Sequence, residues 1–178
     1  MYFAEERIDR LLTELTGYIY PKSEPVKDYW MKRSFSHDLA EAGPDTGGWE
    51  KFSPDDRWGG RDMHFWFRTQ VEIPAGFDGK TVVYMIRTGR EGEWDALNPQ
   101  FLAYVNNNLI QGLDVNHREI ILAEKAAKGE MFDIVLHAYS GMKEGLVELH
   151  TDIRILDREV EKLYYDLKVP LEVIKLLD

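Results

Sequence analysis

Two short stretches of this 178-residue sequence concentrate polar and aromatic side chains. Residues 90–95 read REGEWD, residues 111–118 read QGLDVNHR, and each stretch lies at the end of a predicted strand. Such mixtures bind neutral sugars, because an aromatic face covers the apolar side of the ring while carboxylate, amide and guanidinium groups pair with its hydroxyls. The sequence therefore nominates six carbohydrate-binding candidates: Trp94, Asp95, Asp114, Asn116, His117 and Arg118.

The same residue types also have a purely structural role, which is the more common one. Asp and Asn at strand ends usually cap turns through the backbone, and Trp is usually packed in a core. His64, next to the aromatic run 65–67, is likewise more often a packed residue than a ligand.

Three enzyme signatures fail on spacing or composition. Residues 79–81, GKT, resemble the end of a phosphate-binding loop, but Pro74 stands where its first glycine is required. Residues 117–119 have the His-x-Glu spacing of zinc deaminases, which also need two cysteines, and this chain has no cysteine. Gly89 and Gly92 lack the third glycine of a dinucleotide fingerprint. We therefore expect no catalytic residue, no metal ligand and no cofactor in this chain.

Glycoside hydrolysis is a separate case, because it needs two carboxyl groups held roughly 5 to 10 Å apart. Glu91, Glu93, Asp95 and Asp114 are numerous enough, but their spacing in the sequence does not show whether any two converge. No pair is nominated.

The elements that would position these residues begin with a helix. Ile8, Leu11, Leu12 and Leu15 recur at three- and four-residue spacing, which predicts a short amphipathic helix over residues 5–15. Prolines and paired glycines then break up residues 21–62, which we interpret as loops and turns anchored by four aromatic residues: Trp30, Trp49, Phe52 and Trp58.

Strand patterns follow one another after residue 64, separated by turn residues. The predicted strands are 65–73, 81–88, 101–105, 119–122, 132–139 and 146–156, and Asn106-Asn107-Asn108 predicts a hairpin between 101–105 and 109–112. Because no helical pattern lies between them, we expect an antiparallel β-sandwich or jelly roll.

Helical spacing returns after residue 156, and Pro170 predicts a break before a second helical piece over 171–177. That piece ends at Asp178 without a capping signal, so we expect a truncated chain. The organisation predicted is one domain: residues 1–62 as a helix and irregular segment packed on the sandwich, 63–156 as the sandwich core, and 157–178 as a helical linker toward a missing catalytic domain.

Composition limits the partners. The formal charge of −10, with no basic cluster to offset it, disfavours nucleic acid and anionic membranes. The start of the chain is charged rather than apolar, so it does not resemble a signal peptide, and the absence of cysteine fits a reducing compartment. We expect a cytoplasmic protein.

Three segments carry a family resemblance. The run WDALNPQFLAYVNNNLIQGLDVNHREIIL, together with WGGRDMHFWFR before it and LDREVEKLYYDLKVPLEVIKLL after it, resembles the region that precedes the catalytic domain in cytoplasmic and bacterial α-mannosidases of glycoside hydrolase family 38. The similarity covers nearly the whole chain. It implies a retaining exo-mannosidase whose catalytic barrel follows this region and carries an aspartate nucleophile and a zinc ion. It also implies a galactose-binding-type jelly roll for the leading domain.

Two functions follow, and no catalytic or zinc-binding role is carried over to a residue of this chain. The first is a non-catalytic N-terminal domain of an α-mannosidase, which serves structure, assembly and completion of the active site by docking on the downstream catalytic domain. It predicts exposed apolar side chains at Ile8, Leu11, Leu12 and Leu15 or at Val173, Leu176 and Leu177. The alternative is a carbohydrate-binding module for mannose-containing oligosaccharides, which requires an exposed Trp94. An independent hydrolase ranks last, and a homo-oligomer stays open.

Overall fold

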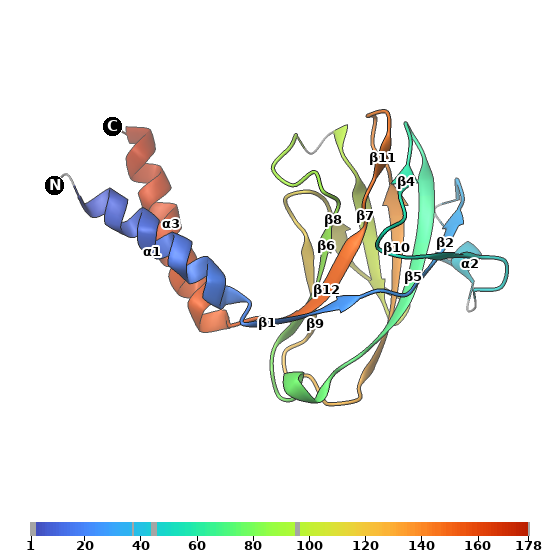
Figure 1. Cartoon of the computed structure of the whole chain (residues 1–178), viewed down its shortest axis with the longest axis horizontal. Helices are drawn as coiled ribbons and strands as arrows, with labels where there is room; N and C mark the ends of the chain where they lie inside the picture. The colour runs from blue at the N-terminus through green and yellow to red at the C-terminus, as the bar shows by residue number, and fades with distance from the viewer. Residues whose placement is uncertain (1–2, 37, 44–45, 95–96, 178) are drawn as a thin grey trace.

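The computed structural model describes residues 3–36, 38–43, 46–94 and 97–177. Within them the chain forms a β-sandwich and a pair of helices that projects from it (Figure 1). The four-stranded sheet has the order β1 (Lys22–Val26), β12 (His150–Ile155), β6 (Val82–Arg87) and β9 (Glu119–Ala123). The six-stranded sheet has the order β3 (Glu50–Phe52), β2 (Tyr29–Arg33), β5 (His64–Glu72), β10 (Met131–Tyr139), β7 (Gln100–Val105) and β8 (Asn108–Leu113).

All strand pairs in both sheets are antiparallel, which confirms the predicted antiparallel sandwich. The predicted strands are present within one or two residues, except that 146–156 divides into β11 (Leu146–Val147) and β12. The hairpin between β7 and β8 is also confirmed. Asn106 and Asn107 turn it with φ values of 50° and 65°, a left-handed conformation that asparagine tolerates well.

The interpretation of residues 21–62 as loops is wrong in part. This segment contributes β1 and β2 to the two main sheets, the short strand β3, a single helical turn α2 (Leu39–Ala42), and β4 (Trp58–Gly59), which pairs with β11. No alternation marks β1, because it is an edge strand held by backbone pairing with β12, and an edge position also tolerates its Pro25. The predicted anchoring by aromatic residues is confirmed: Trp49, Phe52 and Trp58 are buried, and Trp30 is half-buried.

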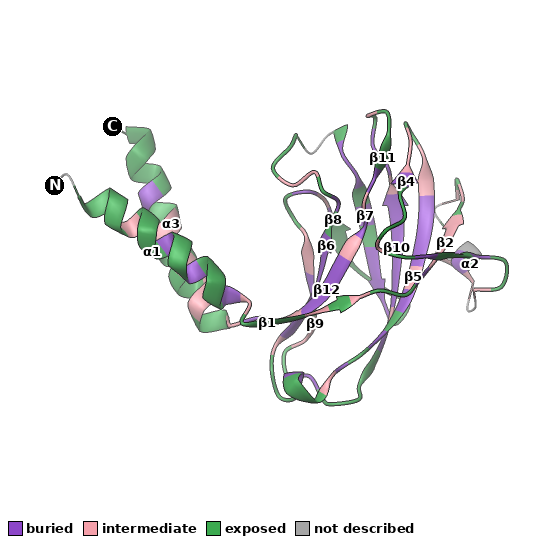
Figure 2. Ribbon diagram, in the orientation of Figure 1, coloured by how far each residue is buried: buried purple, intermediate pink, exposed green. Residues whose placement is uncertain are grey.

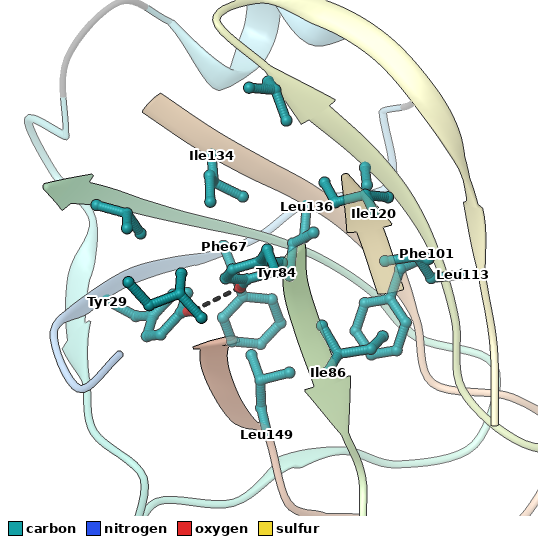
Figure 3. Packing of buried hydrophobic residues seen from close by; sticks show 14 of the residues in the cluster. Tyr29, Phe67, Tyr84, Ile86, Phe101, Leu113, Ile120, Ile134, Leu136 and Leu149 are labelled. Carbon is teal, nitrogen blue, oxygen red and sulfur yellow. Dashed lines mark hydrogen bonds between the residues drawn. The ribbon is translucent and has the colours of Figure 1, made fainter. Parts of the chain in front are cut away.

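The core lies between the two sheets and consists of inward-facing aromatic and branched side chains (Figure 3). Phe65 and Phe67 of β5 pack edge-on against Trp58, with ring centroids 5.4 and 5.2 Å away. The hydroxyls of Tyr29 and Tyr84 lie 2.5 Å apart and join β2 of one sheet to β6 of the other. This pairing satisfies two polar groups that would otherwise be costly to bury.

The helical arm consists of α1 (Ala4–Ile19) and α3 (Arg158–Leu177), which lie antiparallel and extend away from the sandwich (Figure 1). Leu12 and Leu15 of α1 and Leu171 of α3 are buried, and Ile19 packs at the base of the arm against Val83 of β6. Lys175 binds both carboxylate oxygens of Asp9, at 2.9 and 2.7 Å, near the tip. Most other arm residues are exposed (Figure 2).

The predicted break at Pro170 is wrong, because α3 runs through it without interruption. An interior proline loses one backbone hydrogen bond and crowds the preceding turn, at a cost of about 3 kcal/mol. Contacts with α1 on both sides of Pro170 offset that cost: Tyr164 lies in the cluster at the base, and Leu171 and Lys175 lie beyond the proline. Neither helix is long and apolar enough to span a bilayer, and this holds for every helix in the described ranges.

Candidate functional site

The outer face of the six-stranded sheet carries a groove whose side chains are placed by strand register. Tyr139 of β10 pairs with His64 of β5 on one side and with Gln100 of β7 on the other. In the next row of the same face, His137 pairs with Leu102 of β7, and Leu102 pairs with Gly112 of β8. Paired residues of antiparallel strands project to the same side of the sheet, so these two rows form one surface.

We call this surface the outer groove; its volume is about 640 Å³ and it is partly open to solvent. The described residues that line it are Asp62, His64, Gln100, Phe101, Leu102, Gly112, Leu113, Asp114, His137 and Tyr139. The adjoining part of the same face is covered instead: Trp66, Val135 and Tyr104 pack beneath Ala42 and Trp49. The outer groove is therefore the part of the face that the α2 segment leaves uncovered.

Stacked rings form one wall of the outer groove. The imidazoles of His64 and His137 are nearly parallel, with centroids 5.3 Å apart, and His137 also contacts the buried ring of Trp66 at 4.5 Å. The Tyr139 ring lies 4.9 Å from His64. These contacts fix the orientation of the polar edges that line the groove.

Tyr139 is held in its neutral form. Its hydroxyl donates a hydrogen bond to Oδ1 of Asp62 at 3.1 Å. Desolvation raises the pKa of Tyr139, and the hydrogen bond and the negative charge of Asp62 raise it further. The phenol is therefore a hydrogen-bond donor at physiological pH.

Among the sequence-nominated residues that the structure describes, Asp114 alone lines the outer groove, and it also caps a turn. Its Oδ1 accepts hydrogen bonds from the backbone N–H groups of Asn116 at 2.7 Å and His117 at 2.6 Å. Desolvation raises the pKa of Asp114, but these backbone hydrogen bonds outweigh it, so the pKa lies below its usual range. Asn116 and His117 are exposed, Arg118 is half-buried, and none of the three is among the described residues lining the groove.

Trp94 lies in the loop between β6 and β7 and is 73% exposed. The loop is anchored by the fully buried Asn98, whose Nδ2 donates to the Trp94 carbonyl at 2.6 Å. Trp94 also lies outside the described lining of the groove, and Asp95 lies outside the described residues. Trp94 and the outer groove are both open to solvent.

The carboxylates considered for hydrolysis have structural partners. Glu91 accepts the backbone N–H of Thr88 at 2.6 Å, and Glu93 pairs with Lys143. A glycosidase acid requires a raised pKa, yet the pKa of Asp114 is lowered. The carboxyl with a raised pKa in the described chain, Glu119, hydrogen-bonds Tyr20 outside the outer groove. The geometry gives no support to an independent hydrolase.

The resemblance to family 38 implies a His-x-Asp motif at its metal site, and this spacing occurs once in the sequence, at His150-Thr151-Asp152. Asp152 accepts hydrogen bonds from Arg87 at 2.8 Å and from Arg154, and His150 lies 2.8 Å from Glu148. The arginines occupy the carboxylate that a metal would need. Among the described residues no group of three His, Asp or Glu side chains could hold a metal ion.

Solved structures share this fold. No protein-family model matches the chain, and no curated protein sequence matches it. The β-glucuronidase of Ruminococcus gnavus, solved with D-glucuronic acid, superposes with a TM-score of 0.53 at 10% identity over 77% of this chain and 30% of its own. A β-glucuronidase of an uncultured Clostridium sp. gives 0.52 at 9% identity over 76% and 29%. A glycosyl hydrolase family 2 member from Bacteroides cellulosilyticus gives 0.51 at 12% identity over 75% and 20%.

The chain has the fold of a glycoside hydrolase β-sandwich domain. It spans less than a third of the length of each of these enzymes. Identities near 10% establish the shared fold and nothing finer. The resemblance to family 38 in particular rests on the sequence segments alone.

Sequence reasoning missed most of the outer groove. Asp62, His64, Gln100, Leu102, His137 and Tyr139 come from three segments that meet only when β5, β10 and β7 pair. A usable signal was present, since polar residues begin β5 (His64) and β7 (Gln100) and end β10 (His137 and Tyr139), and antiparallel pairing brings these strand ends to one edge of the sheet.

Proposed function

We propose that this chain is a non-catalytic β-sandwich domain of a glycoside hydrolase of the α-mannosidase type, which docks through its helical arm on a catalytic domain of the same polypeptide. The observation that carries this proposal is the apolar surface of the arm. Large apolar side chains exposed there include Leu11, Leu163, Val169, Val173, Ile174, Leu176 and Leu177. Leu176 and Leu177 are 86% and 81% exposed, and a concentration of exposed apolar side chains of this kind marks an interaction site.

The two apolar stripes expected from the sequence have different roles. Leu12 and Leu15 are buried between the helices, so the α1 stripe mainly holds the arm together. Val173, Leu176 and Leu177 of α3 remain uncovered. The α3 side is therefore the surface that we assign to the partner.

A catalytic domain is the occupant that the comparisons favour. In the β-glucuronidases that share this fold, the matching part is about 30% of a longer chain. The α-mannosidase assignment is finer and rests on the residues that resemble family 38. In such a protein the zinc ion and the aspartate nucleophile belong to the catalytic domain.

The test is to assay the chain alone and a longer polypeptide that includes the following domain, each with zinc, on an aryl α-mannoside and an aryl β-glucuronide. We expect the longer protein to hydrolyse the mannoside and the chain alone to hydrolyse neither. Hydrolysis of only the glucuronide would keep the accessory role and overturn the mannosidase type. Hydrolysis by the chain alone would overturn both.

Glycan binding is a second candidate function, favoured by the exposure of Trp94. A tryptophan that is 73% exposed on an anchored loop presents an aromatic face of the kind that sugars stack on. Replacing Trp94 with Ala should reduce retention on a mannan column if this loop binds mannose-containing glycans, and unchanged retention would exclude the loop.

A further inference from the structure

We infer that the outer groove binds one neutral pyranose residue, with the sugar ring against Leu102 and its hydroxyls facing Asp62, His64, Gln100 and Tyr139. This site goes beyond the docking role of the arm and does not rest on it. It lies on the sandwich, and its lining differs from the Trp94 loop.

The shape of the groove depends on the missing side chain at Gly112. Gly112 pairs with Leu102 in the row that forms the floor, and a Cβ built on Gly112 would meet only the Phe101 carbonyl oxygen, at 3.8 Å. The space above residue 112 is therefore open because glycine has no side chain, and the neighbouring backbone would leave room for one. The volume of about 640 Å³ falls within the range of about 300 to 1,000 Å³ usual for small-molecule sites.

The polar wall is ordered before a ligand arrives. His137 is packed between His64 and Trp66, and Tyr139 is fixed by its ring contact with His64 and its hydrogen bond to Asp62. Groups that are already immobilised lose little rotamer freedom on binding, so weak contacts suffice for measurable affinity. Leu102, which is 38% exposed, supplies the apolar patch for the C–H side of a sugar ring.

The charges of the lining select among sugars. Asp62 and Asp114 line the groove, and no Lys or Arg is found among its described lining residues. Carboxylates accept hydrogen bonds from neutral hydroxyls but repel a uronate. We therefore expect neutral pyranosides to bind and glucuronate to be rejected, in contrast to the D-glucuronic acid held by the Ruminococcus gnavus enzyme.

The experiment titrates methyl α-mannopyranoside and, separately, glucuronate into the isotope-labelled chain and follows amide chemical shifts. We expect the mannoside to shift groove residues such as His64, Gly112 and Tyr139 with a Kd on the order of 1 mM, and glucuronate to bind at least about tenfold more weakly. Absence of mannoside-induced shifts at the groove, or equal binding of glucuronate, would overturn the inference.

Gly112→Leu should fill the groove and weaken mannoside binding at least about tenfold without straining the fold, because its φ is not left-handed and its Cβ has room. Gly17→Leu is the matched control, since it adds the same side chain to an exposed position of α1 with no atom within 4 Å of the new Cβ.

Trp94→Ala should leave groove binding unchanged. Loss of mannoside binding in Trp94→Ala, with binding retained in Gly112→Leu, would assign the sugar site to the Trp94 loop and overturn the inference that the outer groove binds it. These measurements need no catalysis, so they succeed or fail independently of the mannosidase proposal.

Discussion

Where the helical arm meets the sandwich, burial determines the pKa of one side chain, Glu119. Glu119 begins β9, and its Oε2 accepts a hydrogen bond from the Tyr20 hydroxyl at 2.5 Å. Desolvation raises the pKa of Glu119 above its ordinary value of 4.5, although the Tyr20 hydrogen bond opposes this. The folded protein therefore holds this proton more tightly than the unfolded chain does, and the stability associated with it is lost as pH rises through the raised pKa.

Replacing Glu119 with Gln should remove this pH dependence while keeping an oxygen for Tyr20. We expect the variant and the wild type to be equally stable near pH 4 and the variant to be more stable at pH 7 by up to about 1 kcal/mol. Urea unfolding at several pH values measures the difference. Destabilisation of the variant that grows as pH rises would show instead that the Glu119 charge is needed, for example by the nearby Arg154.

At the scale of elements, one arginine joins the six-stranded sheet to the segment that covers it. Arg68 of β5 forms two hydrogen bonds with Asp133 of β10, Nε to Oδ1 at 2.9 Å and Nη2 to Oδ2 at 2.6 Å. Its Nη1 also donates to the carbonyl of Gly43, directly after α2, at 2.6 Å. This contact ties the covering α2 segment to the sheet.

Arg68→Ala should destabilise the protein by about 2 to 3 kcal/mol, because Asp133 would remain largely buried without its partner. The matched control is Arg158→Ala, which breaks an exposed pair with Glu124 and should cost less than about 0.5 kcal/mol. Both values come from urea unfolding of the intact chain. Similar losses of unfolding free energy in the two variants would mean that the buried Arg68–Asp133 pair stabilises the protein no more than the exposed Arg158–Glu124 pair does.

The sequence predicts an element well when the interactions that form it are local, and poorly when its partners are far away in the sequence. β5, β6 and β10 were predictable because long apolar or alternating runs mark them locally, and the β7–β8 hairpin because two asparagines suit its turn. β1 was missed because its partner β12 lies more than 120 residues away and pairs through the backbone. The outer groove was missed for the same reason: His64, Gln100 and Tyr139 become neighbours only through register, whereas residues adjacent in the sequence, such as Asp114 and Asn116, proved to form a turn.

At the scale of the whole molecule, the sandwich and the arm differ in how completely they bury apolar surface. The sandwich encloses a large core between two sheets, whereas each helix of the arm has one apolar stripe against its partner and further apolar residues in solvent (Figure 2). A pair of helices that projects into solvent with leucines uncovered is an unfavourable arrangement in isolation. The arm is therefore where the isolated chain should associate with itself.

We expect the isolated chain to form oligomers in sedimentation velocity runs at concentrations of about 10 to 100 µM, and Leu176→Glu with Leu177→Glu to shift it to a monomer. Leu109→Glu is the control, because Leu109 is 56% exposed on β8 of the sandwich and lies off the arm. It should not change the distribution. The same pair of changes should reduce activity in the longer polypeptide by loosening the domain contact. A wild-type chain that stays monomeric at every concentration would contradict the assignment of α3 as a docking surface, and with it the observation on which the accessory role depends.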